Sequence, residues 1–324
     1  MNTGKYLFFI VICFLISSCS KKDNSVPPGV ETYSPLYVAS YRATIGCIVT
    51  SDGGSGIVAC GVYIGTAQDP ETSGARLQMG NDTGIFLGQV AGLEAGTQYF
   101  IKAFASNTAG ESLGSLVEIT TPGIITDYDN NNYETVKIGT RLWMAENLRT
   151  LHFANGDNIA TTEPATLDIS AEATPEYQWA YEGNDTYDDV YGRLYTWFTV
   201  TDTRKVCPTG WHVPSDDEWT ALENTLGGFE VAGSKLKESG NSHWISPYNL
   251  YATNESCFSA LPGGYRNNTG GFSYMGNYGY WWSTSEGDSE NAWIRSLFVQ
   301  SIQITRTDFA KKYGASVRCI KDVK

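Results

Sequence analysis

Short blocks rich in aromatic residues and glycine recur through the C-terminal two thirds of the chain, and they constrain its fold most strongly. The blocks are WMAENL at 143–148, YGRLYTW at 191–197, CPTGWHVP at 207–214, SALPGGYR at 259–266, WWSTS at 281–285 and SVRC at 316–319. Together they define one domain. They identify neither a ligand nor a reaction.

The first residues have the pattern of an export signal. Lys5 supplies a positive charge, residues 6–16 form an unbroken apolar stretch, and ISSC at 16–19 closes it. This stretch is much shorter than the about 20 residues that a membrane-spanning helix needs. Small residues directly before a cysteine are what a lipoprotein signal peptidase requires. We therefore expect residues 1–18 to be a lipoprotein signal peptide and Cys19 to carry the lipid; an ordinary secretory signal is the alternative.

Residues 19–32 are polar, contain Pro27, Pro28 and Gly29, and show no apolar period, so we interpret them as a tether. With a lipid on Cys19, the chain is expected in the cell envelope, as an outer-membrane lipoprotein facing the periplasm or the cell surface. Its net charge is −13 with only 22 Lys and Arg. Binding of nucleic acid by charge alone is therefore excluded, and the membrane is a partner only through the anchor.

Residues 33–122 have the pattern of an all-β sandwich. Alternation at 42–50 and 99–105 and apolar runs at 57–64 and 85–90 predict strands. Tyr99 follows Leu93 in the arrangement of a tyrosine corner. The segments LEAGTQY at 93–99 and ASNTAG at 105–110 resemble fibronectin type III domains. This resemblance implies a spacer or a protein-contact unit.

Residues 123–324 are predicted to be α+β, with two helices followed by antiparallel strands. Apolar residues at helical spacing predict one helix over 191–201. The second begins at Ser215 with Glu218 three residues on, a capping box, and ends at Gly227 and Gly228. The strands expected after it cover 257–261, 280–283, 292–299, 303–308 and 315–321.

The blocks above, together with YETVKIG at 133–139, resemble the Fibrobacter succinogenes major paralogous domain over about residues 124–322. The resemblance implies a C-type lectin-like fold, which sulfatase-modifying enzymes share, in an exported or lipid-anchored surface protein. It also implies a disulfide between Cys207 and Cys319. Cys257 departs from the family pattern and is the expected unpaired thiol. The predicted fold class is therefore an all-β sandwich followed by an α+β C-type lectin-like domain.

Seven cysteines are present; Cys13 lies in the signal and Cys19 is the lipid site, which leaves five, an odd number. At least one thiol should therefore be free in an oxidising compartment. Cys47 and Cys60 are either a second disulfide between neighbouring strands or two buried thiols. No Cys-x-x-Cys pair supports a zinc or redox motif.

Catalytic motifs are absent from the sequence, so no enzyme and no cofactor are expected. The only histidines are His152, His212 and His243, and His212 lies in a block that indicates packing. No zinc-protease motif, nucleophile elbow or phosphate loop occurs. The sulfatase-modifying relatives use a pair of cysteines, and Cys257 has no partner once Cys207 and Cys319 are bridged.

Metal binding has one weak candidate, in the segment that contains Asp127, Asp129 and Asn131. Oxygen ligands at alternate positions suit calcium, but the later glycine and acidic residue of an EF-hand are absent, and a turn is favoured. Glu163-Pro164-Ala165 only partly matches the motif by which calcium-dependent lectins hold sugar. Calcium-dependent sugar binding is therefore not expected.

An exposed aromatic surface is the remaining candidate site, built from Tyr274, Tyr278, Tyr280 and Trp282 in and beside a glycine-rich stretch. Trp281 and Trp282 are neighbours on a strand, so at least one should lie in the core. The others could stack on sugars or anchor a protein, or merely fill the fold. We therefore expect non-catalytic binding or adhesion with a glycan or protein partner. The alternatives are a purely structural surface scaffold and an enzyme related to sulfatase-modifying proteins.

Overall fold

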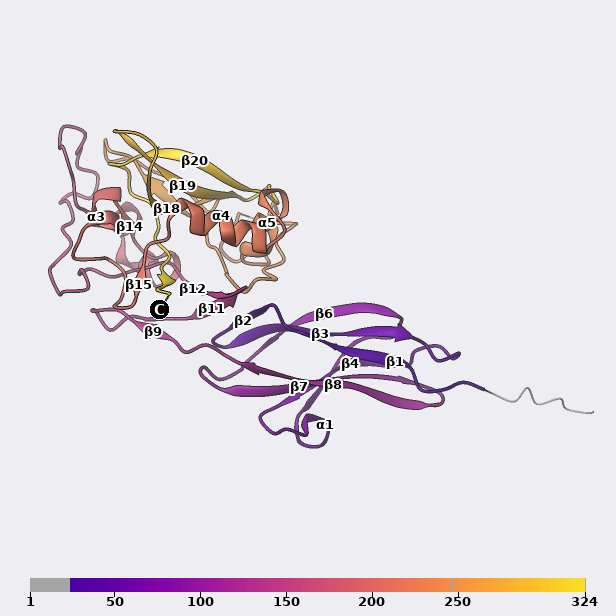
Figure 1. The fold of residues 1–324 in the computed structure, drawn as a ribbon. Helices are drawn as coiled ribbons and strands as arrows, with labels where there is room; N and C mark the ends of the chain where they lie inside the picture. Colours follow the sequence, from indigo (N-terminus) through magenta and orange to yellow (C-terminus); the bar gives the residue numbers. More distant parts are fainter. Residues whose placement is uncertain (1–23, 246, 324) are drawn as a thin grey trace, which may run out of the picture.

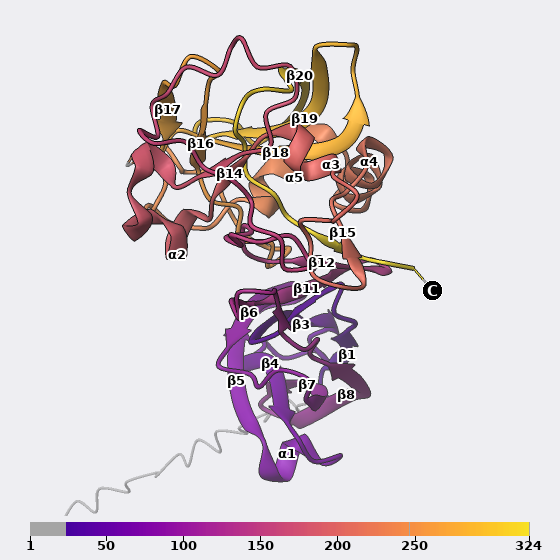
Figure 2. The ribbon, with the colours of Figure 1, turned by 90° about the vertical axis from the view of Figure 1, so that its left-hand side faces the viewer.

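The structure is a computed structural model that describes residues 24–245 and 247–323. The predicted signal peptide and Cys19 lie outside these residues, so lipidation stays a prediction. Within the described part of the chain, no helix is both long and apolar enough to cross a membrane. Figures 1 and 2 show a β-sandwich joined end-on to a larger domain that contains the longer helices.

The N-terminal domain consists of two facing sheets with the strand order of a fibronectin type III-like domain. The first sheet contains β1 (Gly29–Tyr33), β3 (Arg42–Ser51) and β6 (Gly84–Ala91). The second contains β5 (Ala75–Gly80), β4 (Ala59–Gly65), β7 (Gln98–Asn107) and β8 (Gly110–Thr120), with the short helix α1 (Pro70–Ser73) beside it. The sandwich architecture is confirmed.

The sandwich begins earlier than the sequence indicated. β1 starts at Gly29, inside the segment predicted as a tether, because it pairs with β3 over its whole length. Even Val26 is held, since its amide donates to the carbonyl of Gly53 (2.9 Å) and its carbonyl accepts from the side chain of Asn107 (2.7 Å). A five-residue edge strand is too short to show a clear apolar period.

Alternation places one side of β3 in the core of the sandwich. Ala43, Ile45 and Cys47 are fully buried and pack in one cluster with residues of β4 and β7. The predicted tyrosine corner is present, because the hydroxyl of Tyr99 accepts a hydrogen bond from the amide of Glu94 at 2.9 Å.

One sheet runs from the sandwich into the C-terminal domain. After β1, the short strand β2 (Tyr37–Ala39) pairs with β11 (Thr135–Ile138), and the sheet continues through β12 (Arg141–Met144), β21 (Ile320–Lys321) and β15 (Trp211–His212). Arg42 forms an ion pair with Glu134 across the junction (2.9 Å). The two domains therefore share backbone hydrogen bonds, unlike modules joined only by a linker.

The C-terminal domain is built on a five-stranded sheet. Its order is β17 (Phe272–Met275), β16 (Gly263–Arg266), β18 (Tyr278–Glu286), β19 (Asn291–Phe298) and β20 (Ile304–Ala310). The helices α4 (Asp216–Thr225) and α5 (Phe229–Leu236) lie along this sheet in Figure 1, and Trp219 and Leu222 of α4 share a core cluster with Trp281 and Leu297. Further short elements are β9 (Ile125–Thr126), β10 (Asn132–Tyr133), η1 (Tyr181–Gly183) and η2 (Asp185–Tyr187).

The prediction of one helix over 191–201 is wrong. Here α2 (Asp188–Tyr191) ends at Gly192, β14 (Leu194–Tyr195) pairs with β13 (Gln178–Trp179), and α3 (Trp197–Thr201) follows. Gly192 has a φ of 69°, and a Cβ there would lie 2.7 Å from the carbonyl oxygen of Leu148. Close packing on the WMAENL block therefore breaks the helix, although the apolar spacing suits one.

The helix predicted from Ser215 is confirmed. The hydroxyl of Ser215 accepts from the amide of Glu218, and the carboxylate of Glu218 accepts from the amide of Ser215, which completes the capping box. The glycine pair 227–228 ends α4 but leads directly into α5, which the sequence did not predict.

Three of the predicted late strands are present as β18, β19 and β20. The segment 257–261 is not a strand, because Cys257 and Ser259 have φ values of 58° and 52°, far from extended backbone. Of the stretch 315–321, only β21 is a strand; Ala315 and Ser316 form isolated bridges, with Tyr195 and Trp281, and residues 317–319 form none.

The predicted disulfide between Cys207 and Cys319 is confirmed, and it links residues 112 apart. Cys47, Cys60 and Cys257 are free and buried. Of the two alternatives for Cys47 and Cys60, the structure therefore shows two buried thiols and not a disulfide.

Candidate functional site

The weak metal candidates are held by protein donors. Asp127 accepts hydrogen bonds from the amide of Asn131 (2.9 Å) and the hydroxyl of Tyr133 (2.6 Å). The side chain of Asn131 donates to Asp127 as well (2.9 Å). This is the geometry of a turn that closes on its own carboxylate. Among the residues that the structure describes, no group of three or more acidic, His or Cys side chains could hold a metal.

Asp129 belongs to a separate local network. Its carboxylate accepts from the hydroxyl of Thr150 (2.8 Å), the amide of Leu151 (2.6 Å) and the ring of His152 (2.5 Å). Partial burial opposes ionisation, but these hydrogen bonds outweigh it and lower the pKa of Asp129. The charged carboxylate thus fixes the loop around His152.

The prediction that Trp282 belongs to a ligand-binding surface is wrong, because this residue is 0% exposed. Its indole N–H donates to the carbonyl of Tyr195 at 2.7 Å, and that of Trp281 donates to the side chain of Asn147 at 2.8 Å. β18 lies inside the sheet, and its two faces join two different core clusters. Both neighbouring tryptophans are therefore core residues.

Tyr278 and Tyr280 are half-buried and form part of a stack of rings. Tyr278 stacks on Phe298 (4.6 Å between ring centroids) and on Tyr280 (5.5 Å), and Tyr280 stacks on Phe309 (5.3 Å). Their ring faces are thus occupied by other rings. Tyr274 differs, because it is 52% exposed and makes only tilted and edge contacts, with Tyr265 and Tyr278. Of the four predicted surface residues, Tyr274 alone offers a large accessible ring.

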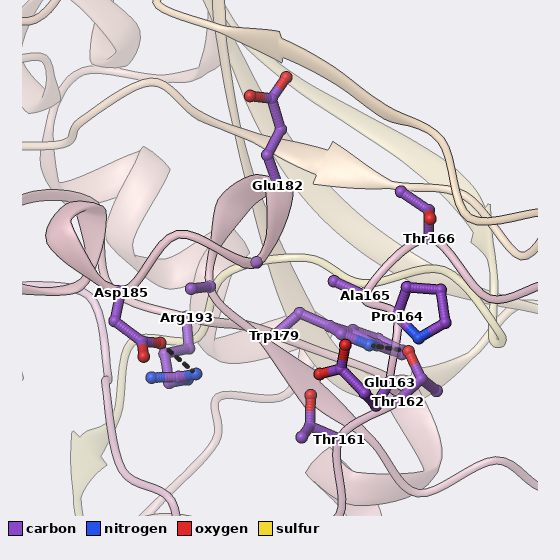
Figure 3. A pocket seen from close by; sticks show the side chains of 12 residues that line it. Thr161, Thr162, Glu163, Pro164, Ala165, Thr166, Trp179, Glu182, Asp185 and Arg193 are labelled. Carbon is purple, nitrogen blue, oxygen red and sulfur yellow. Dashed lines mark hydrogen bonds and ion pairs between the residues drawn. The ribbon is translucent and has the colours of Figure 1, made fainter.

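A pocket of about 430 Å³ lies beside the β16–β17 hairpin and was not predicted (Figure 3). Residues 161–166 form one wall, and residues 179–185 with Arg193 form the other. Figure 3 shows Glu163 close to Trp179 and Thr162, and Asp185 paired with Arg193. The volume is in the range of small-molecule sites.

Buried contacts fix the walls of this pocket. The indole N–H of Trp179 donates to the hydroxyl of Thr162 at 2.9 Å. Arg266 is fully buried, donates to the carbonyl of Ala165 (2.9 Å), and places its guanidinium 4.1 Å from the centre of the Trp179 ring. Arg193 is held by ion pairs with Asp185 and Asp188. The pocket is therefore preformed.

The lining of the pocket suits hydrogen bonding to a polar ligand. The side chains of Thr161, Glu163, Thr166 and Glu182 are exposed to it or at its rim. They supply hydroxyl donors and carboxylate acceptors, while Pro164 adds an apolar surface. The lining includes no histidine, cysteine, serine or lysine; its polar groups are threonine hydroxyls, carboxylates and the guanidinium of Arg193.

Sequence reasoning missed this pocket for a physical reason. Its two walls come from segments that show no helical or strand period, and buried contacts of Arg266 and Trp179 help to bring them together. The single signal was Glu163-Pro164-Ala165, which we interpreted as an incomplete lectin motif.

The sequence model of the Fibrobacter succinogenes major domain matches residues 136–321. The chain belongs to this family. The pocket, Tyr274 and the Cys207–Cys319 disulfide all lie within the matched residues of the Fibrobacter succinogenes major domain. The family prediction is thus confirmed, while nothing in the comparisons supports the C-type lectin-like fold.

A comparison with curated proteins finds no match. Two solved structures similar to the chain are small domains. The sensor domain of the anti-sigma factor RsgI4 from Pseudobacteroides cellulosolvens is 19% identical, covering 30% of this chain and 96% of that one, with a TM-score of 0.24. The fibronectin type III domain of human fibronectin type III domain containing protein 3 is 19% identical, covering 32% of this chain and 93% of that one, with a TM-score of 0.22.

Proposed function

We propose that this chain is a lipid-anchored, non-catalytic binding protein of the cell envelope whose Fibrobacter succinogenes major domain holds a glycan in the pocket of Figure 3. The observation that carries the proposal is the preformed pocket lined by Thr161, Glu163, Thr166 and Glu182. A sugar presents many hydroxyl groups, and carboxylates and threonine hydroxyls can both pair with them.

The arrangement of the domains supports display away from the membrane. In Figure 1 the chain enters the sandwich at the end opposite the C-terminal domain. We predict that Cys19 carries the lipid anchor of an outer-membrane lipoprotein. This anchor holds the C-terminal domain at the far end of the sandwich, away from the membrane. The backbone pairing of β2 with β11 keeps the two domains in one orientation.

A protein partner is the second candidate, and Tyr274 favours it. Exposed tyrosines are typical anchors of protein interfaces, and Tyr274 stands beside the stacked rings of Tyr278 and Tyr280. The order of helices before strands and the long-range disulfide are consistent with a C-type lectin-like fold, which we keep as a proposal. The enzyme alternative has no support from Cys257, because this thiol is fully buried and burial raises its pKa.

A glycan array probed with the full chain in mild detergent tests the proposal. We expect binding to at least one glycan, and Glu163→Gln should weaken it roughly tenfold, because a charged hydrogen-bond acceptor is lost. Glu290→Gln is the matched control, since Glu290 is also an exposed carboxylate but lies outside the pocket. Equal binding by both variants would place the glycan elsewhere, and no binding at all would leave the scaffold alternative.

A further inference from the structure

β6 forms a free edge of the sandwich. It pairs with β3 along one side, from Arg42 opposite Ala91 to Val49 opposite Gly84. No strand of the described chain pairs with its other side, and Figure 1 shows β6 as the outermost strand of its sheet. A free edge presents unpaired N–H and C=O groups that another strand can bond.

The other long edge strands of the described chain carry charges that hinder such pairing. Glu31 lies in β1, Arg76 in β5, Glu111 in β8 and Arg306 in β20. β6 has the sequence GIFLGQVA, without a charge or a proline. Charges and prolines are the devices that natural edge strands use against association, and β6 has neither.

The outward side of β6 is also apolar. Ile85 is 63% exposed and Leu87 is 42% exposed, whereas Phe86 and Val90 pack against the core of the sandwich. Leu87 lies over Gly46 of β3. Two large apolar side chains therefore stand next to the unpaired backbone edge.

We propose that β6 pairs in antiparallel fashion with β6 of a second copy of this chain. Each copy carries a net charge of −13, so two copies repel, and an uncharged strand is where they can approach at the lowest electrostatic cost. A two-fold axis at Leu87 places Leu87 against Leu87 and Ile85 against Gln89. In this register Asp82, just before the strand, faces Gly92, so no like charges of the two paired segments meet.

The pairing joins the first sheets of two sandwiches and covers Ile85 and Leu87. It does not depend on the proposed glycan site, because β6 lies in the other domain. If both hold, the dimer presents two pockets, and a polymer that reaches both is bound with increased avidity.

Sedimentation velocity of the full chain in mild detergent, over a series of concentrations, tests the proposal. We expect a dimer in the wild type. Leu87→Lys should weaken the dimer by at least about a hundredfold, because two lysines then meet at the axis. Leu116→Lys is the control, since Leu116 is 37% exposed but lies on β8, which already carries charges.

A cross-link tests the register. Leu87→Cys faces its own copy at the axis and should form a dimer that reductant dissolves, whereas Leu116→Cys should not. The three free cysteines among the described residues are buried and should not interfere. A monomer at every concentration overturns the proposal. So does a dimer that survives Leu87→Lys in a chain whose circular dichroism melt is unchanged, because the contact then lies elsewhere.

Discussion

The side-chain oxygen of Asn147 accepts a hydrogen bond from Nε of Arg318 at 3.0 Å. The same oxygen accepts from the indole of Trp281, and Arg318 also donates to the carbonyls of Phe258 and Ser259. Residues from separate sequence blocks therefore meet in one buried polar network. Arg318 has no carboxylate among these partners, and burial lowers its pKa to about 9.

Loss of the Asn147 side chain should destabilise the C-terminal domain. Asn147→Ala leaves the indole of Trp281 and one donor of Arg318 without a partner, so we expect the free energy of unfolding to fall by about 2–4 kcal/mol. Urea unfolding followed by tryptophan fluorescence measures the change. Asn224→Ala, on the exposed side of α4, should change it by less than about 0.5 kcal/mol; an equal effect of the two variants would contradict the network.

The Cys207–Cys319 disulfide should contribute strongly to stability. It closes a loop across 112 residues of sequence, for which the chain-entropy description gives about 4–5 kcal/mol. Replacement of both cysteines by alanine should lower the free energy of unfolding by roughly this amount, as measured in urea. Replacement of Cys47 by alanine, a buried free thiol, serves as the comparison; a double variant as stable as the wild type would refute the prediction.

Glu218 should make stability fall in acid. Burial opposes its ionisation, but hydrogen bonds from the amide of Ser215 and the ring of His212, with the charge of Arg141, outweigh burial and lower its pKa below the ordinary 4.5. Because the folded-state pKa is the lower one, the stabilisation is present above 4.5 and is lost as the pH falls through the folded value.

Glu218→Gln should therefore cost about 1–2 kcal/mol at neutral pH, and its difference from the wild type should shrink below pH 4.5. Unfolding in urea at several pH values measures this. Asp217→Asn is the control, because Asp217 is an exposed neighbour in the same helical turn. A difference that stays constant with pH would show that Glu218 is not the group that titrates.

The junction between the domains should transmit instability from one to the other. The amide of Ser40 donates to the carbonyl of Thr135, and the hydroxyl of Ser40 accepts from the amide of Thr135, both at 2.9 Å. Ser40→Ala leaves that amide unpaired and should cost about 1–3 kcal/mol.

Tryptophan fluorescence can detect this coupling, because all 9 tryptophans lie at or after residue 143. Ser40 belongs to the sandwich, yet its replacement should lower the urea midpoint seen by these tryptophans. Ser55→Ala, a half-buried position outside the junction between the domains, should leave it unchanged. An unshifted midpoint in Ser40→Ala would indicate that the domains unfold independently.

Local signals in the sequence predicted much of the fold. The alternation of β3 and the capping box at Ser215 depend on neighbouring residues, and both predictions held. The helix expected over 191–201 failed because Gly192 packs against Leu148, a contact far away in the sequence. Such a contact produces no periodic pattern of apolar residues in the sequence.

The candidate site was harder to predict, because exposure depends on what covers each strand. Trp282 is a residue type that is common in binding sites, but it lies inside a sheet that is covered on both faces. The segment around Glu163 shows no recognisable period, and the pocket around it forms where contacts of Arg266 and Trp179 help to bring two segments far apart in the sequence together. Tyr274 was the one predicted surface residue with a large exposed area.

Hydrogen–deuterium exchange of the full chain, with and without a glycan selected on the array, tests the proposed binding site most directly. We predict slower exchange in peptides that cover 161–166 and 179–185 when the glycan is bound, and unchanged exchange in the sandwich. Protection confined to the peptide that contains Tyr274, or protection nowhere despite measured binding, would contradict the pocket as the site.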